Sequence, residues 1–270
     1  MKDRTRNKFD AIREKLSGKN VLVAFSGGVD STVLASVVSE TAARTTLLTI
    51  TSATVPEREV ASAISIAERL GLDLIMKDLD WLSYEGLAAN RADRCYSCKQ
   101  ILASMWIETA RSMGLDIVVE GTTSSETEGY RPGLKALEES GVQSPFLNAA
   151  ITKEEIREYA RERGLSVADK PSMACLATRF PYGTKIDLDR LRMVDTVEQA
   201  VVDIFGVRCV RARYHGNLVR IEVGEDELNL MFDITKLNQI EQIARKVGFT
   251  YVTLDLRGYR TGAMDENLVL

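Results

Sequence analysis

The chain has 270 residues, of which 45% are hydrophobic and 27% charged, with a formal net charge of −4 and a pI near 5.4. This composition can fill the core of one large domain, or of a medium domain with a smaller one attached. No apolar run reaches the roughly eighteen residues of a membrane span, and the acidic balance argues against a partner gripped mainly through nucleic-acid phosphates.

Apolar runs and helical patterns alternate from the first residues to about residue 163. The run at 20–25, rich in β-branched residues, is typical of a strand buried on both faces of a parallel sheet. Thr152 followed by Glu155 predicts a capped helix start, and Gly71 and Gly164 predict helix ends. The expected strands lie at 20–25, 46–51, 72–77, 116–120 and 145–148, and the expected helices at 5–17, 31–42, 56–70, 97–113 and 152–163. This alternation predicts an α/β fold with a doubly wound parallel sheet.

The pattern changes after residue 182. Helices are expected at 187–204 and 234–247, and strands at 209–214, 218–223 and 250–254. The first two of these strands are expected to pair antiparallel through a turn that contains His215, the only histidine. The stretch 171–184 is rich in small and turn-forming residues and predicts the boundary. We therefore expect one domain at 1–180 and a smaller C-terminal α+β domain at 181–270.

A glycine pair stands between the first expected strand and the helix after it, in the string Ser26-Gly27-Gly28-Val29-Asp30-Ser31. Glycines let backbone N–H groups approach a phosphate, and the helix dipole favours negative charge at the same place. The hydroxyls of Ser26 and Ser31 can add donors, whereas Asp30 is expected to hold Mg²⁺. The string lacks the Gly-Lys-Ser/Thr ending of the P-loop and the dinucleotide fingerprint. A plain strand-to-helix turn is the alternative.

This six-residue string resembles the pyrophosphate loop of the ATP pyrophosphatase superfamily, which includes NAD synthetase, the ATP domain of GMP synthetase, argininosuccinate synthetase and tRNA thiolation enzymes. The resemblance implies that the chain binds ATP, adenylates a substrate oxygen, releases pyrophosphate and lets a nucleophile displace AMP. It also implies that the loop and Mg²⁺ stabilise the departing pyrophosphate. The superfamily holds its nucleoside at the end of the second strand, here 49–52, so Ser52 is a candidate ATP contact. Met76 and Gly121 are further candidates from the next strand ends.

The chain contains four cysteines, and its charged first 19 residues lack the apolar core of a signal peptide. We expect a cytoplasmic protein, in which cysteines serve metal binding or catalysis rather than structural disulfides. Cys95 and Cys98 fall on one turn of an expected helix beside Arg94, an arrangement that favours thiolates. Cys175 lies far downstream, and Cys209 is expected to be a buried strand residue.

The Cys-x-x-Cys pair on its own is open to several interpretations: a redox pair, half of a zinc site, or two thiols that merely pack. Three cysteines that converge on a nucleotide crevice could hold a [4Fe-4S] cluster with one iron left open to bind a sulfide. A three-cysteine zinc site is the main competing metal site.

A longer string narrows the family. Residues 170–183, together with 129–133 and 258–262, resemble the LarE sulfur transferases, and the likeness runs over nearly the whole chain. These enzymes help to make the nickel-pincer nucleotide cofactor: they adenylate a carboxylate of pyridinium-3,5-biscarboxylic acid mononucleotide and convert it to a thiocarboxylate. In one variant of the family, a single cysteine at the Cys175 position gives up its own sulfur. In the other, three cysteines bind a [4Fe-4S] cluster that relays sulfide, and Cys95, Cys98 and Cys175 match this variant.

The same resemblance implies a substrate-phosphate site. Arg211 and Arg213 alternate on an expected strand and therefore share one face. They match residues that grip the substrate phosphate, helped by Arg179 and Thr178, and guanidinium forks suit phosphate well. Glu198 joins this site by the same analogy. A solvated strand face is the alternative interpretation of the arginine pair.

The resemblance makes Cys175, Asp30 and Arg179 the expected catalytic residues. It also implies a homo-oligomer that acts on a small-molecule nucleotide, with neither a nucleic acid nor a membrane as partner, and with substrate binding and oligomerisation as roles of the C-terminal domain. His215 is expected to serve the hairpin rather than the chemistry.

Two other functions stay open. Some tRNA-thiolating relatives share both the loop and a three-cysteine cluster, although the acidic pI and the C-terminal strings argue against a tRNA substrate. The non-enzymatic alternative is a nucleotide-sensing or iron–sulfur carrier protein that binds ATP without turnover.

Overall fold

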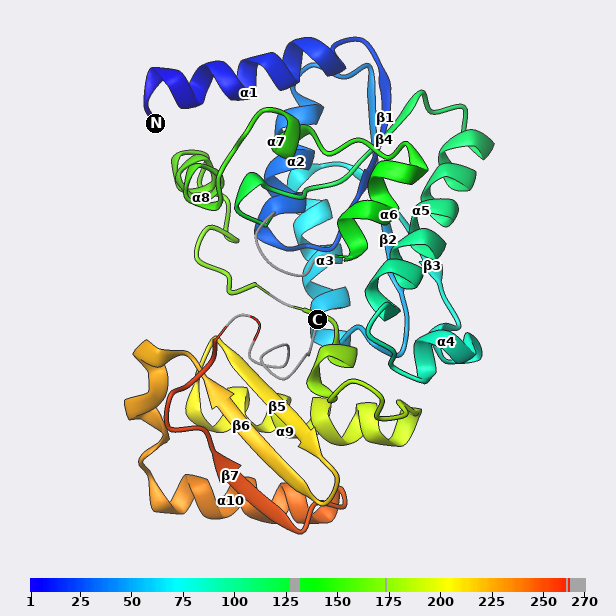
Figure 1. Cartoon of the computed structure of the whole chain (residues 1–270). Helices are drawn as coiled ribbons and strands as arrows, with labels where there is room; N and C mark the ends of the chain where they lie inside the picture. The colour runs from blue at the N-terminus through cyan, green and yellow to red at the C-terminus, as the bar shows by residue number, and fades with distance from the viewer. Residues whose placement is uncertain (127–131, 173, 261, 263–270) are drawn as a thin grey trace. The chain divides into compact units, whose positions relative to one another are not determined.

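The computed structural model describes residues 1–126, 132–172, 174–260 and 262 and divides the chain into two compact units (Figure 1). Unit 1 comprises Met1–Leu79 and Asp93–Ser172, and unit 2 comprises Asp80–Ala92 and Met173–Leu270. The domain boundary expected after residue 180 lies a few residues inside unit 2. The sequence patterns did not predict that residues 80–92 leave unit 1 and pack in unit 2; we call this segment the excursion. Residues 129–131, 173 and 261 of the family strings lie outside the described residues.

Unit 1 is built on a parallel sheet with strand order β3-β2-β1-β4. Its strands are β1 (Asn20–Ala24), β2 (Arg44–Thr51), β3 (Asp73–Asp78) and β4 (Ile117–Val119). Val21 and Val23 enter one hydrophobic core, whereas Leu22 and Ala24 enter the other, because successive side chains of a strand point to opposite faces. Both faces of the sheet are therefore covered, and the predicted doubly wound α/β fold is confirmed.

Helices cover each face of this sheet (Figure 1). The first core takes side chains from α1 (Asp3–Leu16), α2 (Val29–Ser39), α3 (Glu57–Leu70) and α8 (Lys153–Glu162). The second takes them from α5 (Arg94–Ser112) and α6 (Pro132–Ser140). The left-handed conformation of Gly71 ends α3 as predicted, and the capping box of Thr152 and Glu155 starts α8 as predicted.

The expected fifth strand at 145–148 is wrong. Pro145–Asn148 forms a one-turn helix, α7, with Pro145 in its first turn, a position where the fixed φ of proline suits a helix. A strand-like contact with β4 is made two residues before this helix, where Gln143 forms an isolated parallel bridge to Val119. A short apolar run does not by itself separate a strand from a single helical turn. A one-turn 3-10 helix, η2 (Ser124–Glu126), precedes this region.

Unit 2 contains a three-stranded sheet with order β5-β6-β7. β5 (Val210–His215) and β6 (Leu218–Val223) pair antiparallel as predicted, and β7 (Tyr251–Leu254) adds to β6 in parallel. Unit 2 also contains the helices α9 (Leu188–Phe205), η4 (Glu225–Met231) and α10 (Ile234–Lys246), among others. Cys209 corrects the expectation of a buried strand residue: it is half-buried and precedes the first residue of β5.

The excursion at 80–92 forms η1 (Trp81–Ser83) and α4 (Glu85–Ala88), and it is held by the chain that follows η3 (Leu176–Arg179). The Asn90 side chain donates to the carbonyl oxygen of Pro181 over 2.8 Å, and the Asn90 carbonyl accepts from the N–H of Gly183 over 2.9 Å. Asn90 is fully buried and left-handed, with φ of 55°, a conformation that asparagine tolerates better than most residues. Within the described ranges, every helix is too short or too polar to cross a membrane.

Replacing Thr152 by alanine should lower the free energy of unfolding of unit 1 by about 1 kcal/mol, because the first turn of α8 loses its side-chain cap. Trp106 lies in unit 1 and Trp81 in unit 2, and the sequence has two tryptophans. Urea unfolding followed by Trp106 fluorescence in a Trp81→Phe background therefore measures this unit. Thr152→Ser keeps the hydroxyl and should stay within a few tenths of the parent; equal losses for alanine and serine would contradict the capping role.

Candidate functional site

The loop of residues 26–28 joins β1 to the N-terminus of α2 at the carboxyl end of the parallel sheet. Gly28 is the N-cap residue of α2 and brings no capping side chain. The positive end of the helix dipole thus faces the loop, at the edge where parallel α/β sheets bind their ligands. A helix N-terminus behind a glycine loop at this edge is an arrangement that can bind a phosphate.

Two glycines allow this loop to pack closely. Gly27 has φ of +66°, and a Cβ there would come within 2.8 Å of the Cα of Ala63 in α3. A Cβ on Gly121 would lie 3.1 Å from the backbone of Asp30 and Ser31. Any larger residue would therefore push α3 or the end of β4 away from the loop. Gly121, a predicted nucleoside contact, packs directly against the start of α2.

The two serines of the loop share one hydrogen-bonding group. Their hydroxyl oxygens are 3.2 Å apart, and the Ser31 hydroxyl also accepts from the Ser26 N–H over 3.2 Å. Ser31 is buried, whereas Ser26 is exposed. Ser26 and Ser31 are thus brought together at the mouth of the loop, where hydroxyl donors can reach an anion.

Asp30, the expected Mg²⁺ ligand, forms an ion pair with Lys153 through Oδ2. Its other oxygen, Oδ1, is buried and has no hydrogen-bond partner among the described residues. A buried carboxylate oxygen without a donor is costly unless a cation or water satisfies it. The carboxylate therefore fits a hard cation such as Mg²⁺, which oxygen ligands suit.

The candidate nucleoside contacts lie along the sheet edge. Ser52 follows β2, and its hydroxyl is 2.9 Å from that of Thr54. Met76 lies inside β3 rather than at its end, opposite Thr49, with a side chain that is 44% exposed. An exposed methionine beside the end of β2 leaves an apolar surface there, which suits the flat face of a base.

The expected cluster ligands belong to different units. Cys95 and Cys98 lie in the first turn of α5 in unit 1, both half-buried, and Cys175 is exposed in unit 2 as the N-cap residue of η3. The buried guanidinium of Arg94 donates to the sulfur of Cys95 over 3.5 Å. None of the cysteines is in a disulfide. In the described part of either unit, no three Cys, His, Asp or Glu side chains form a metal-binding group.

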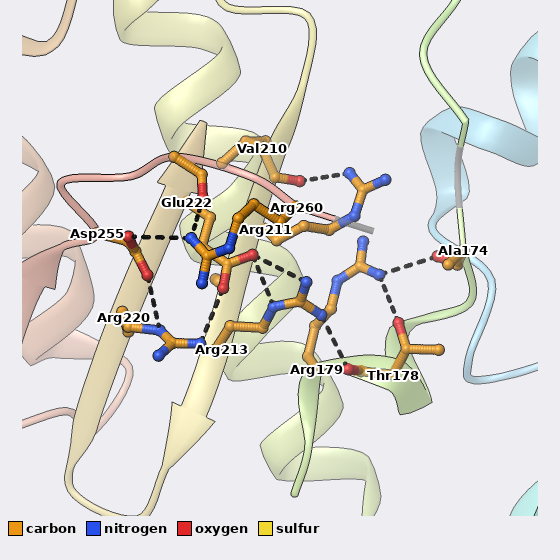
Figure 2. A network of polar contacts seen from close by, with 12 residues as sticks. Ala174, Thr178, Arg179, Val210, Arg211, Arg213, Arg220, Glu222, Asp255 and Arg260 are labelled. Carbon is orange, nitrogen blue, oxygen red and sulfur yellow. Dashed lines mark hydrogen bonds and ion pairs between the residues drawn. The ribbon is translucent and has the colours of Figure 1, made fainter. Parts of the chain in front are cut away.

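Unit 2 contains a cluster of buried and half-buried arginines and carboxylates, part of which is drawn in Figure 2. Arg179 of η3 and Glu198 of α9 are both fully buried and form a two-pronged ion pair, with N···O distances of 2.6 and 3.1 Å. Arg179 also donates to the carbonyl oxygen of Ala174 and to the hydroxyl of Thr178. Arg179 thereby holds the backbone just before Cys175 and the side chain of Thr178 after it.

Arg211 and Arg213 of β5 point from one face of the strand into this cluster (Figure 2). Arg213 binds Glu222 through two nitrogens, at 3.0 and 2.8 Å, and donates to the carbonyl oxygen of Thr178 at 3.0 Å. The guanidinium of Arg211 lies 4.8 Å from the ring centre of Tyr259. All the predicted substrate-phosphate residues are thus brought together, and the alternative of a solvated strand face is excluded by burial of both arginines.

The cluster is electrically unbalanced. Among the described residues it holds five guanidinium groups and three carboxylates, which leaves a surplus of two positive charges; the members are Arg179, Arg211, Arg213, Arg220, Arg260, Glu198, Glu222 and Asp255. Burial, followed by the charge of Arg179, lowers the pKa of Arg211. Burial opposes ionisation of Glu198, but Arg179 and the N–H of Ala212 overcome it and hold the pKa of Glu198 below its ordinary value. A dianion would balance the surplus.

Several polar residues of these sites escaped the sequence analysis. Lys153 and Lys170 both contact the loop region in unit 1, and Glu222 anchors the arginines of unit 2. Lys153 could have been noticed in the sequence, because it is the first residue of a predicted helix, a position where the helix dipole disfavours a cation. Glu222 could have been noticed as well, since it alternates with apolar residues on a strand that the sequence predicts. His215 ends β5 opposite Leu218, as expected for a hairpin residue.

Comparison of the sequence with known proteins identifies relatives. The model of the family "Queuosine biosynthesis protein QueC" matches residues 20–93, which include the loop. A pyridinium-3,5-bisthiocarboxylic acid mononucleotide synthase of Lactiplantibacillus plantarum is 33% identical over 93% of this chain and 90% of its own length. An uncharacterized protein of Synechocystis is also 33% identical, over 92% of each chain.

A more distant relative is a tRNA-specific 2-thiouridylase MnmA of Rhizorhabdus wittichii. It is 27% identical over 78% of this chain and 65% of its own length. The likeness to the mononucleotide synthase is thus both higher and more complete.

Acid should weaken unit 2 through Glu198. Because its folded pKa lies below the ordinary value of 4.5, its stabilising effect is complete above that value and is lost as the pH falls through the folded pKa. Urea unfolding followed by Trp81 fluorescence in a Trp106→Phe background, between neutral pH and about pH 3, measures this loss.

Glu198→Gln is the matched variant. It should lower the free energy of unfolding at neutral pH by about 3–5 kcal/mol, because Arg179 is left buried without its partner, and it should show a shallower acid dependence. Identical acid dependence in parent and variant would contradict the assignment to Glu198.

Proposed function

Because the chain belongs to the LarE family of ATP-dependent sulfur transferases, we propose that it adenylates a carboxylate of pyridinium-3,5-biscarboxylic acid mononucleotide and converts it to a thiocarboxylate. The observation that carries this proposal is the identity of 33% with a mononucleotide synthase, spread over nearly the whole of both chains. The loop, the thiols and the arginine cluster supply the chemistry that such a reaction needs.

The first half of the reaction is cleavage of ATP at the loop. A carboxylate oxygen of the substrate attacks the α-phosphorus, the bond to the bridging oxygen breaks, and pyrophosphate leaves. The α2 N-terminus and the hydroxyls of Ser26 and Ser31 stabilise the negative charge that develops on the leaving group. Asp30 would hold Mg²⁺, which supplies further positive charge next to the pyrophosphate. Lys153 keeps Asp30 neutralised when that ion is absent.

The phosphate monoester of the substrate is assigned to the arginine cluster of unit 2. Its surplus of two positive charges matches the charge of a phosphate monoester near neutral pH. Arg211 and Arg213 supply planar donors from one strand face, and Arg179 with Thr178 extends the same cluster to the segment of Cys175. Glu198 and Glu222 hold these side chains in fixed directions, so little entropy is lost when the phosphate binds.

The second half of the reaction replaces AMP by sulfur. A sulfide attacks the acyl carbon of the adenylate, the bond to the AMP oxygen breaks, and the proton of the sulfide is released. Cys95, Cys98 and Cys175 would hold a [4Fe-4S] cluster, which supplies this sulfide. Two half-buried thiols in one helical turn, with a guanidinium at Cys95, fit anionic sulfur ligands.

Thiolation of tRNA is the second candidate, favoured by the match to the 2-thiouridylase of Rhizorhabdus wittichii. The two candidates differ in their acceptor, a carboxylate of a small nucleotide or a base of a large polyanion. Release of pyrophosphate with either acceptor added separately distinguishes them. An ATP-binding carrier without turnover would release no pyrophosphate with either.

Cys175→Ala is expected to abolish formation of the thiocarboxylate and to leave pyrophosphate release from ATP and the mononucleotide detectable, because the variant loses a sulfur ligand and keeps the loop. Both products are measured on the same anaerobic samples, by mass spectrometry and by a coupled pyrophosphate assay. Cys209→Ala is the control and should retain both activities, since Cys209 is assigned no role.

The opposite result, in which Cys175→Ala still makes thiocarboxylate, would refute the role of Cys175 as a sulfur ligand. Mass spectrometry of the parent after turnover also separates the two family variants. A sacrificial Cys175 would lose the elements of H₂S and stop after one product per chain, whereas a cluster-bound cysteine keeps its mass.

A further inference from the structure

The side chain of Lys170, which follows α8 in the chain, contacts both the loop of residues 26–28 and helix α3. Its ammonium donates to the carbonyl oxygen of Gly27 over 3.1 Å and to the hydroxyl of Ser62 over 2.9 Å, and it pairs with Glu59 at 2.8 Å. The side chains of Lys170 and Glu59 are only 18% and 16% exposed. A lysine fixed on three acceptors loses much of its rotamer freedom, so the contact is a built one rather than a surface ion pair.

The backbone of Lys170 is fixed as well. Its N–H donates to the carbonyl oxygen of Val167 over 3.0 Å, and its own carbonyl accepts from the guanidinium of Arg157 in α8 over 2.9 Å. The backbone of Lys170 is thus held by Val167 and by Arg157 of α8, and its ammonium group holds the loop between β1 and α2.

The direction of this contact matters for anion binding. In a trans peptide, the C=O group and the N–H group that follows it point in opposite directions. Lys170 holds the Gly27 carbonyl on one side, so the N–H of Gly28 is turned to the other, where it lies 3.4 Å from the Ser26 hydroxyl. That hydroxyl is part of the serine pair at the mouth of the loop.

Gly27 cannot hold this orientation unaided. Glycine is the residue with the widest choice of backbone conformations, and two adjacent glycines allow the peptide between them to rotate. If the peptide turned over, a carbonyl oxygen would face the anion instead of an N–H donor. A fixed external donor is therefore needed, and Lys170 with its partner Glu59 supplies it.

We infer that Lys170 is a positioning residue for the pyrophosphate of the ATP-cleaving step: it fixes the Gly27–Gly28 peptide so that the Gly28 N–H faces the leaving group. This inference rests on the proposed function, because it assigns the loop to pyrophosphate. Lys170 itself binds the far side of the peptide and acts through the backbone, not as a ligand of the phosphates.

Lys170→Met tests the inference, since methionine keeps most of the length of the side chain and removes the ammonium. Binding of inorganic pyrophosphate with Mg²⁺ to the whole chain is measured by calorimetry. We expect affinity to fall by about tenfold or more, the loss typical of one hydrogen bond that involves a charged group. Lys170→Arg keeps a cationic donor and should recover part of the affinity.

Lys8 offers a matched control in the same unit. Its ammonium also contacts a backbone carbonyl, that of Ala150, and pairs with the carboxylate of Glu155, and its side chain is 19% exposed. Lys8→Met should destabilise unit 1 about as much as Lys170→Met and leave pyrophosphate affinity unchanged. Equal weakening by both variants would show a merely structural role and overturn the inference.

Normal pyrophosphate binding by a folded Lys170→Met would overturn the assignment of Lys170 alone. Failure of the parent chain to bind pyrophosphate would overturn the proposed function and the inference together. If Lys170→Met does not fold, Glu59→Gln carries the test, because it keeps the ammonium and removes the carboxylate that aims it. It should weaken binding severalfold, and unchanged affinity overturns the inference.

Discussion

The proposed chemistry depends on close packing where β1 leads into α2. The loop of residues 26–28 and the first turn of α2 lie between α3 on one side and the end of β4 on the other, and glycines at 27 and 121 allow this approach. The loop therefore cannot shift toward α3 or toward the end of β4. This packing fixes the position of the loop, and the orientation of the Gly27–Gly28 peptide is the part that we assign to Lys170. Donors that are fixed in advance are effective in stabilising a leaving group.

In unit 2 the main feature is a set of buried arginines that are only partly neutralised by carboxylates. Buried guanidinium groups are costly unless they are paired, and the phosphate site that we propose for this cluster also needs positive charge left over to attract a dianion. Glu198 and Glu222 meet both demands, because each carboxylate neutralises part of a larger arginine set and leaves a positive surplus. Other hydrogen bonds of the same arginines reach the carbonyl oxygens of Ala174 and Thr178, so the proposed substrate site and the backbone around Cys175 belong to one network.

Local patterns in the sequence predicted most of the fold. Strands buried on both faces, the capped start of α8 and the left-handed end of α3 follow from side-chain periodicity and backbone preferences, and each was found. The one-turn helix at Pro145–Asn148 was missed because four residues are too few to distinguish the side-chain period of a helix from that of a strand. The excursion of 80–92 was missed for another reason: it is held by Asn90 through contacts with residues about ninety positions away, which no local pattern encodes. The loop residues and the arginine cluster were found from motifs, but their partners Lys170 and Glu222 were not, since a partner is defined by distance in space.

In the proposed reaction a carboxylate oxygen of the substrate attacks the α-phosphate of ATP, and isotope transfer shows whether that oxygen ends up in AMP. The mononucleotide is prepared with ¹⁸O in its carboxylates and incubated anaerobically with the whole chain, ATP, Mg²⁺ and sulfide. Mass spectrometry of the AMP formed should show one ¹⁸O atom in each molecule, because the acyl–oxygen bond breaks when sulfur displaces AMP. AMP that carries no ¹⁸O would mean that ATP is cleaved without passing through the acyl adenylate, and it would contradict the adenylation mechanism.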